Sequence, residues 1–132
     1  MKNTVVFDFD GVIHSYTSGW KGEDVIPDPP VEGIEKVISN LRDCGYEIII
    51  VSTRSATQKG IQAMIDWLKK YNIDYDNISD VKPPALVYID DRAICFDGDT
   101  TKLVSKIKNF VPWTEEKKIV DACNKHPTVY CC

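Results

Sequence analysis

Apolar runs and apolar stripes alternate along the first part of this chain. Short runs rich in β-branched and aromatic residues occupy 4–9, 46–51 and 85–89, a pattern typical of buried strands in a parallel sheet. Between them, 31–44 and 61–68 carry apolar residues at three- and four-residue spacing, which predicts amphipathic helices. Alternating strands and helices predict right-handed βαβ units. We therefore expect an α/β fold, a Rossmann-like three-layer α/β/α sandwich with a mainly parallel sheet.

Turn residues set the expected ends of these elements. Pro30 suits the first turn of the first helix, and Gly45 is the expected stop after it. The second helix should begin between Ser55 and Gly60. The segment 72–82 is polar and turn-rich, and the two prolines that follow it exclude a helix there.

The segment 12–28 has neither a helical nor a strand period. We interpret it as a long loop or short hairpin, called the flap below, beside the end of the first strand. Loops of this length in a small domain are often functional lids, and a disordered excursion is the alternative.

Residues beyond the third strand carry weaker signals. Residues 93–96 could form a short extra strand and 97–99 a turn. Thr114, with acids at the next two positions, begins an expected final helix that reaches about residue 124. We divide the chain into a core, residues 1–112, and a C-terminal helix with a short tail, residues 113–132. A further helix in the core would have a buried side formed by Leu103, Val104 and Ile107.

Composition narrows the function classes. The chain has 132 residues, enough for one domain, and its net charge of -4 excludes a domain-wide basic surface for nucleic acid. We find neither a secretory leader nor an apolar run of membrane-spanning length, so we expect a cytoplasmic protein without a membrane partner.

The cysteines do not predict a disulfide framework. There are five, an odd number, and none is in a Cys-x-x-Cys pair, which favours free thiols. Four C-terminal residues could in principle bind zinc, but their spacing departs from zinc-finger patterns, so we expect a reduced, unstructured tail. These residues are Cys123, His126, Cys131 and Cys132.

Polar side chains follow each of the three predicted strands. Asp8 and Asp10 share one face of a strand, and like charges so close repel unless a cation or a proton lies between them. A solvated turn is the alternative for an isolated Asp-x-Asp-Gly. Ligands of parallel sheets bind beyond the carboxyl ends of the strands, however, and that edge collects several such groups. The other two strands end in Ser52, Thr53 and Arg54, and in Asp90 and Asp91.

These ordered motifs resemble those of the haloacid dehalogenase superfamily of phosphohydrolases. The motifs are Asp8-Phe9-Asp10-Gly11-Val12, Ser52-Thr53, Lys82 and Ile89-Asp90-Asp91, and the resemblance spans about residues 4–98. The segments 11–30 and 54–81 are too short for a cap domain, so the chain resembles the small capless branch, in which a flap partly covers the site. The segment 65–92 also resembles, more loosely, the phosphatase half of polynucleotide kinase-phosphatases.

The resemblance implies a mechanism through an aspartyl-phosphate. Asp8 would be the nucleophile. Asp10 would protonate the leaving oxygen and later activate water. Ser52 or Thr53 would hydrogen-bond the phosphoryl group, with Ser52 the first choice, and Lys82 would neutralise both Asp8 and the phosphate.

The resemblance also implies a Mg²⁺ cofactor. Its ligands would be Asp8, the main-chain carbonyl of Asp10, and Asp90, with Asp91 as direct or water-mediated support. The residue types agree, because aspartates converging at one sheet edge need a divalent cation and oxygen donors favour Mg²⁺ over zinc.

Three further residues are candidates for substrate contact. Arg54 could bind a phosphate group, or simply pair with a helix acid. His14 and Trp20, both in the flap, could contact the leaving group, Trp20 by stacking, and ordinary flap packing is the alternative for each.

The leading hypothesis is a Mg²⁺-dependent phosphomonoester hydrolase acting on a small phosphorylated substrate such as a nucleotide or sugar phosphate. Alternatives are a polynucleotide 3′-phosphatase-like activity on a short 3′ end, and a non-catalytic phosphate-binding module on the same fold. Dehalogenation and phosphoryl transfer to another acceptor are less favoured, because Asp10 supplies the acid and base that phosphoester hydrolysis requires. Substrate identity and oligomeric state do not follow from the sequence.

Overall fold

The computed structural model describes residues 3–115. Most of the expected final helix, and the cysteine-rich tail, lie outside the described residues. The chain divides into two compact units, residues 1–90 and 91–132, and each is described by itself. The boundary expected at residue 112 stays a prediction.

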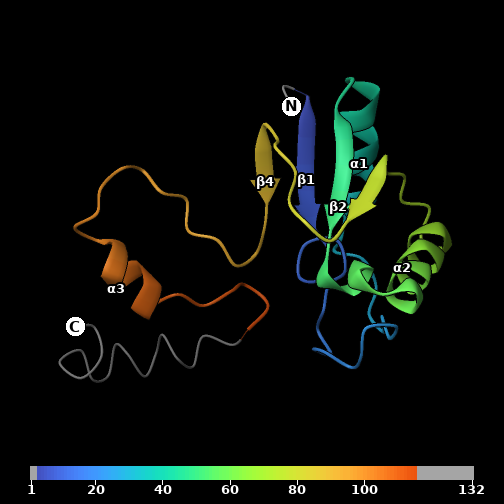
Figure 1. Ribbon diagram of the computed structural model, residues 1–132, viewed down its shortest axis with the longest axis horizontal. Coiled ribbons are helices and arrows are strands. Elements are labelled where there is room, and N and C mark those ends of the chain that lie inside the picture. Colours follow the sequence, from blue (N-terminus) through green and yellow to red (C-terminus); the bar gives the residue numbers. More distant parts are fainter. Residues whose placement is uncertain (1–2, 116–132) are drawn as a thin grey trace. The chain divides into compact units, whose positions relative to one another are not determined.

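Four strands form one parallel sheet in the first unit, in the order β3-β2-β1-β4 (Figure 1). Asp8 pairs with Val51, and Phe7 pairs with Ile89, so the residues that follow β1, β2 and β4 emerge at the same edge. The predicted α/β, Rossmann-like fold with a parallel sheet is confirmed. The strands are β1 (Thr4–Asp8), β2 (Glu47–Val51), β3 (Asn77–Ser79) and β4 (Val87–Ile89).

Two helices connect the first three strands. α1 (Ile34–Asp43) lies between β1 and β2, and it begins later than the apolar stripe predicted because Gly33 adopts a left-handed conformation (φ 83°). α2 (Gln58–Lys70) lies between β2 and β3 and follows a 3₁₀ turn at Thr53–Ala56. The Thr57 side chain caps α2 by accepting a hydrogen bond from a main-chain N–H group of its first turn.

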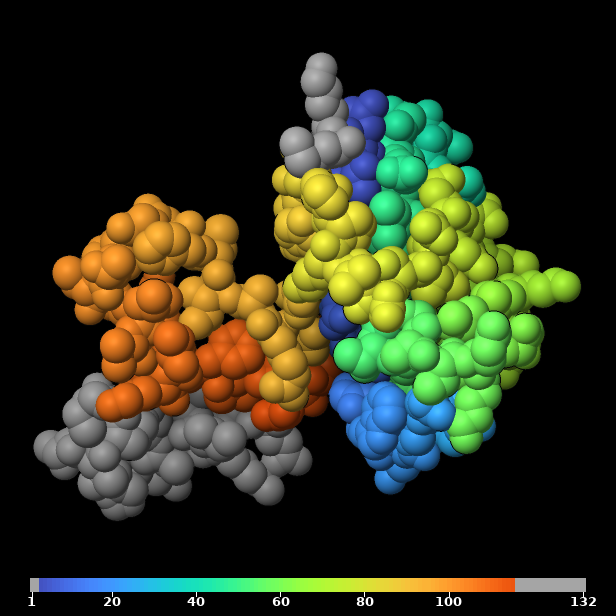
Figure 2. Space-filling model, viewed as in Figure 1, coloured from blue at the N-terminus to red at the C-terminus, as the bar shows by residue number. Residues whose placement is uncertain are grey.

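The main core lies on the face of the sheet that both helices cover. The opposite face carries a smaller cluster of Val6, Ile49 and Val51, against which Ala85 packs. Figure 2 shows the segment before β4, in yellow, lying over the strands on this side. β1 and β2 are therefore buried on both faces, as their apolar runs predicted. The main core consists of Val5, Phe7, Phe9, Ile13, Ile38, Ile48, Ile50, Met64, Trp67, Leu68 and Ile73.

β4 is exposed, so the prediction of a third buried strand at 85–89 is wrong. All three residues of β4 are between 39% and 43% exposed. Among residues 3–115 it is the last strand in the sheet, and an apolar groove of about 350 Å³ lies between it and α1, lined in part by Val5, Val37 and Leu86. Position at the sheet edge, and not composition, decides the burial of this strand.

The sheet also contains a strand that the apolar pattern did not predict. β3 pairs with β2 through its main chain, although two of its three residues are Asn77 and Ser79. A three-residue edge strand with polar side chains has too short a pattern to be distinguished from a turn.

The described part of the second unit contains one short helix, α3 (Leu103–Lys108). Residues 93–96, considered above as an extra strand, form no strand. Val104 and Ile107, expected to be buried, are 61% and 58% exposed. Among the described residues, no helix is both long and apolar enough to cross a lipid bilayer.

Candidate active site

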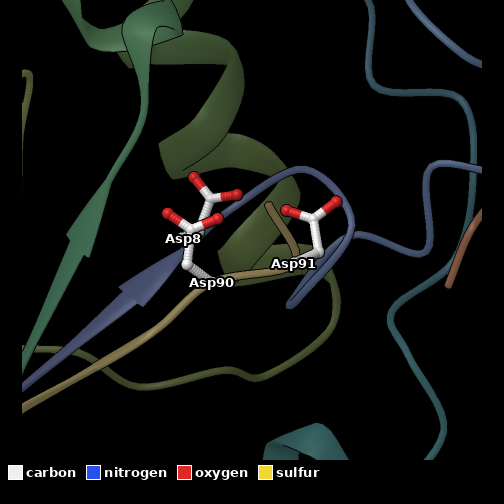
Figure 3. A group of neighbouring side chains, drawn as sticks. All are labelled: Asp8, Asp90 and Asp91. Atoms are coloured by element: carbon white, nitrogen blue, oxygen red, sulfur yellow. The ribbon is translucent and has the colours of Figure 1, made fainter. Parts of the chain in front are cut away.

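Three carboxylates meet where β1 and β4 end. Asp8 is the last residue of β1, Asp90 follows β4 directly, and Asp91 is the next residue of the chain. One carboxylate oxygen of each lies within 4.8 Å of the others. Figure 3 shows the Asp8 and Asp90 carboxylates side by side. Because β1 and β4 are adjacent and parallel, the structure brings together three of the four predicted metal ligands.

Lys82 supplies positive charge to this group. It lies in the segment between β3 and β4, and its Nζ is 2.8 Å from Oδ2 of Asp90. This hydrogen bond, with the negative charges of Asp90 and Asp8, outweighs partial desolvation and raises the pKa of Lys82 above its usual value. Lys82 therefore stays protonated at neutral pH and offsets part of the negative charge at the sheet edge.

Asp10 has different neighbours, and its carboxylate is held from both sides. Oδ1 lies 2.8 Å from Nδ1 of His14, and Oδ2 accepts a hydrogen bond of 2.9 Å from Nε of Arg54. A tight turn makes this possible, because the Phe9 carbonyl accepts hydrogen bonds from the main-chain N–H groups of residues 12–14. That turn brings His14 back beside Asp10.

Arg54 is a fully buried cation in the 3₁₀ turn after β2, with 0% of its surface exposed. Its Nη1 donates to three main-chain carbonyls of the flap, and the ring of Trp20 lies 4.6 Å from the guanidinium carbon. Within the described chain, Nη2 has no hydrogen-bond partner. The guanidinium therefore joins the flap to Asp10. The three carbonyls belong to Gly22, Glu23 and Val25, at 2.8, 3.0 and 3.1 Å.

His14 is equally buried, and it lies between two aspartates. Nδ1 is 2.8 Å from Oδ1 of Asp10, and Nε2 is 3.2 Å from the main-chain nitrogen of Asp28 and 3.6 Å from its Oδ2. The imidazole also stacks on Phe9 and meets Trp67 edge to face.

Asp28 anchors the end of the flap, and sequence reasoning missed it. The main-chain N–H and the hydroxyl of Ser18 donate to its carboxylate at 2.8 and 2.6 Å, and its carbonyl accepts from Nε1 of Trp67 at 3.1 Å. Burial raises the pKa of Asp28, but hydrogen bonds from Ser18 and Thr17, together with the nearby His14, outweigh it and hold the pKa below its usual value. The one sequence signal is the position of this acid between Pro27 and Pro29, which stiffen the backbone on both sides.

The two hydroxyls after β2 have different environments. Ser52 is buried, and its Oγ accepts a hydrogen bond of 3.1 Å from the main-chain N–H of Arg54. Thr53 is exposed. Since Val51 pairs with Asp8, both hydroxyls follow a strand that ends level with β1.

These placements bear on the roles expected for the flap and Arg54. Leaving-group contact and ordinary flap packing were both open for His14, and its full burial with both nitrogens hydrogen-bonded favours packing within the flap. Arg54 binds Asp10 and the flap and not a helix acid, and its pairing with a phosphate stays a prediction. Trp20 is 53% exposed, and its stacking on a substrate stays a prediction.

Comparisons with protein-family models, with curated proteins and with solved structures give no significant match to this chain. The fold and the arrangement of these side chains are therefore the basis of the proposal that follows.

Proposed function

We propose that this protein is a Mg²⁺-dependent phosphomonoester hydrolase of the haloacid dehalogenase type, acting through an aspartyl-phosphate on Asp8. One observation carries the proposal. Carboxylate oxygens of Asp8 and Asp90, at the ends of adjacent parallel strands, lie within 4.8 Å of each other, and Lys82 is bonded to Asp90. Such a cluster of like charges is costly for folding alone and is typical of a site that binds a cation and an anionic substrate.

The donor set fits Mg²⁺. Asp8, Asp90 and Asp91 offer only carboxylate oxygens, and they are neither fully buried nor fully exposed, which leaves room for water and a phosphate group. When bound, Mg²⁺ would neutralise charge on the phosphoryl group during its transfer.

The residues of the chain would supply the other parts of the reaction. A carboxylate oxygen of Asp8 attacks phosphorus, the bond from phosphorus to the leaving oxygen breaks, and the carboxylic acid form of Asp10 gives its proton to that oxygen. Water then attacks the phosphorus of the aspartyl-phosphate while the Asp10 carboxylate takes a proton from it. Inorganic phosphate leaves and Asp8 is regenerated. Lys82 stabilises the negative charge of the phosphate.

Phosphate release from 4-nitrophenyl phosphate tests this proposal. We expect turnover by the wild-type protein with Mg²⁺, loss of turnover in EDTA, and loss of turnover in Asp8→Asn. Asp43→Asn is the matched control, because Asp43 is an exposed carboxylate at the end of α1. Full activity of Asp8→Asn would overturn the assignment of the nucleophile.

A wider panel addresses the substrate. It contains nucleotides, sugar phosphates, phosphopeptides and 3′-phosphorylated oligonucleotides, with Mg²⁺ present and Asp8→Asn as the blank. Preferred turnover of the oligonucleotides would identify a polynucleotide 3′-phosphatase. Binding of these esters without any turnover would indicate a phosphate-binding module.

A further inference from the structure

Trp20 is a large aromatic residue that the flap keeps half exposed, at 53% of its surface. The Arg54 guanidinium lies over one face of the indole ring, with its central carbon 4.6 Å from the ring centre. Because Arg54 is itself fully buried, the exposed area of the ring lies on its edges and on the opposite face. The same guanidinium donates to Oδ2 of Asp10 through Nε. Trp20 therefore presents an open ring face two contacts away from Asp10.

The main chain on both sides of Trp20 is held in place. Gly19 has a φ of 74°, and its N–H donates to the carbonyl of Tyr16 at 3.1 Å. Gly22 has a φ of 125°, and its carbonyl accepts from Nη1 of Arg54 at 2.8 Å. The ring is therefore positioned before a ligand arrives, which lowers the entropy cost of stacking a ligand on it.

The cation beneath the ring restricts the chemistry of its open face. A cation over one face draws π-electron density towards itself and leaves the other face less negative. Ammonium groups, and the C–H groups of a sugar ring, bind a negative ring face and gain little here. A nucleobase stacks through its large flat area and dispersion, and it keeps its attraction. The open face of Trp20 therefore favours a nucleobase over an amine or a sugar.

We propose that Trp20 is a specificity residue that stacks the base of a nucleoside monophosphate whose phosphate lies at Asp8. This inference rests on the proposed function and names its substrate class, nucleotides in place of sugar phosphates. A ribose separates the base of such a substrate from its phosphate, as the Arg54 side chain separates Trp20 from Asp10. Trp20 touches the base and not the reacting atoms, so it should act on KM more than on kcat.

Two substrates isolate the contribution of the base. Adenosine 5′-monophosphate and ribose 5-phosphate carry the phosphate on the same oxygen of ribose and differ in the adenine. The ratio of their kcat/KM values does not depend on the fraction of protein that is folded, and damage to the phosphate site lowers both values together. We expect a wild-type ratio of at least about tenfold in favour of the nucleotide, within the range that stacking of a base on an aromatic side chain provides. A wild-type ratio near one would overturn the proposal.

Trp20→Leu keeps an apolar side chain over Arg54 but removes the flat ring. We expect it to lower the ratio by at least about fivefold, mainly by raising KM for the nucleotide. Trp20→Phe keeps an aromatic ring and should retain most of the ratio. If Trp20 only covers Arg54, Trp20→Leu changes both kcat/KM values together and leaves the ratio unchanged, and that result would contradict the stacking role.

Val37→Ala is the control for loss of an exposed apolar side chain. Val37 lies on α1 and is 50% exposed, close to the exposure of Trp20. We expect the ratio of this variant to equal that of the wild-type protein. An equal fall of the ratio in Val37→Ala and Trp20→Leu would show that the effect is not specific to the ring.

Tryptophan fluorescence gives a readout without turnover, in Asp8→Asn protein with Mg²⁺. Adenosine 5′-monophosphate should quench part of the emission, because a stacked base quenches indole, and ribose 5-phosphate should not. Adding Trp20→Leu should remove this response, although Trp67 and Trp113 remain. Quenching by the nucleotide that persists in the double variant would overturn the proposal.

The two assays separate this inference from the proposed function. If the wild-type protein hydrolyses 4-nitrophenyl phosphate but neither the ratio nor the fluorescence responds to Trp20→Leu, only the stacking role fails. If it hydrolyses no phosphate ester, the proposed function fails, and the fluorescence alone decides whether Trp20 binds a base.

Discussion

Asp8 and Asp10, the first two aspartates of the candidate site along the chain, are close in sequence but lie in contrasting surroundings. Asp8 joins Asp90 and Asp91 in a cluster of like charges that Lys82 offsets only in part. The Asp10 carboxylate is bonded by protein donors on both oxygens. The first setting leaves negative charge for a cation to neutralise, and the second provides neutralisation and orientation from within the fold.

Substitutions around Asp8 and substitutions around Asp10 should therefore affect different properties of the protein. The carboxylate cluster lies at the ends of rigid strands and costs the fold some repulsion, so its changes should affect catalysis and metal binding most. The Asp10 setting is built from buried side chains and flap carbonyls, so its changes should affect stability as well.

The largest expected effect is on catalysis in the carboxylate cluster. We expect Asp8→Asn to lower kcat for 4-nitrophenyl phosphate by at least about 10³-fold. Catalytic residues act together, so loss of the nucleophile alone removes most of the rate enhancement. The initial rate of nitrophenolate release measures this. A loss of less than tenfold would indicate that Asp8 is not the attacking group.

The next effect is on stability in the Asp10 setting. Arg54→Met keeps an apolar stem but leaves Asp10 and three flap carbonyls without their donor, so the free energy of unfolding should fall by about 3–5 kcal/mol. Urea unfolding measures the change. Lys59→Met is the control, because Lys59 is 66% exposed and should cost less than about 1 kcal/mol. Equal losses in the two variants would mean that Arg54 does not hold the flap.

The effect of Mg²⁺ on the free energy of unfolding should also distinguish the surroundings of Asp8 from those of Asp10. At a Mg²⁺ concentration of about 100 times Kd, binding should raise the free energy of unfolding of the wild-type protein by about 2.7 kcal/mol. Asp90→Asn should remove this increase, whereas His14→Asn should keep it, because His14 lies outside the cluster. Urea unfolding with and without Mg²⁺ measures both. An equal Mg²⁺ response in the two variants would place the metal elsewhere.

The smallest effects should come from pH, with opposite signs in the two settings. The folded pKa of Asp28 lies below its unfolded value, so its contribution to stability is present above about pH 4 and is lost as pH falls through the folded pKa. The folded pKa of Lys82 lies above its unfolded value, so its contribution is present below about pH 10 and is lost as pH rises through the folded pKa.

Urea unfolding across the acid range, repeated with Ser18→Ala, checks the acid side. We expect Ser18→Ala to flatten the decrease in stability below about pH 4, because it removes a cause of the low pKa of Asp28. Identical acid profiles for the two proteins would contradict the account of Asp28.

The sequence predicted the parts of the fold that depend on local pattern. The continuous apolar run Ile48-Ile49-Ile50-Val51 predicted a strand buried on both faces, and β2 is such a strand. The similar run at 85–89 gave the same prediction, but β4 is an edge strand beside an open groove. The order of strands across a sheet decides burial here, and a local pattern does not contain that order.

The candidate site was likewise predictable only where it depends on local sequence pattern. Strand ends predicted that Asp8, Asp90 and Asp91 would meet, because parallel strands end at one edge. The supporting roles of His14 and Arg54 depend on a tight turn and on flap carbonyls, which residue types and spacing do not specify. The sequence therefore left open whether His14 and Arg54 contact a substrate or support the flap.

The proposed function is tested most directly by a rapid-mixing experiment with Asp10→Asn and 4-nitrophenyl phosphate in Mg²⁺. Because nitrophenolate leaves without a proton but hydrolysis of the aspartyl-phosphate needs a base, we expect a burst of about one nitrophenolate per protein molecule, followed by slow turnover. Peptide mass spectrometry should place the phosphoryl group on Asp8. No burst, or a burst with equal amplitude in the double variant that adds Asp8→Asn, would contradict the account.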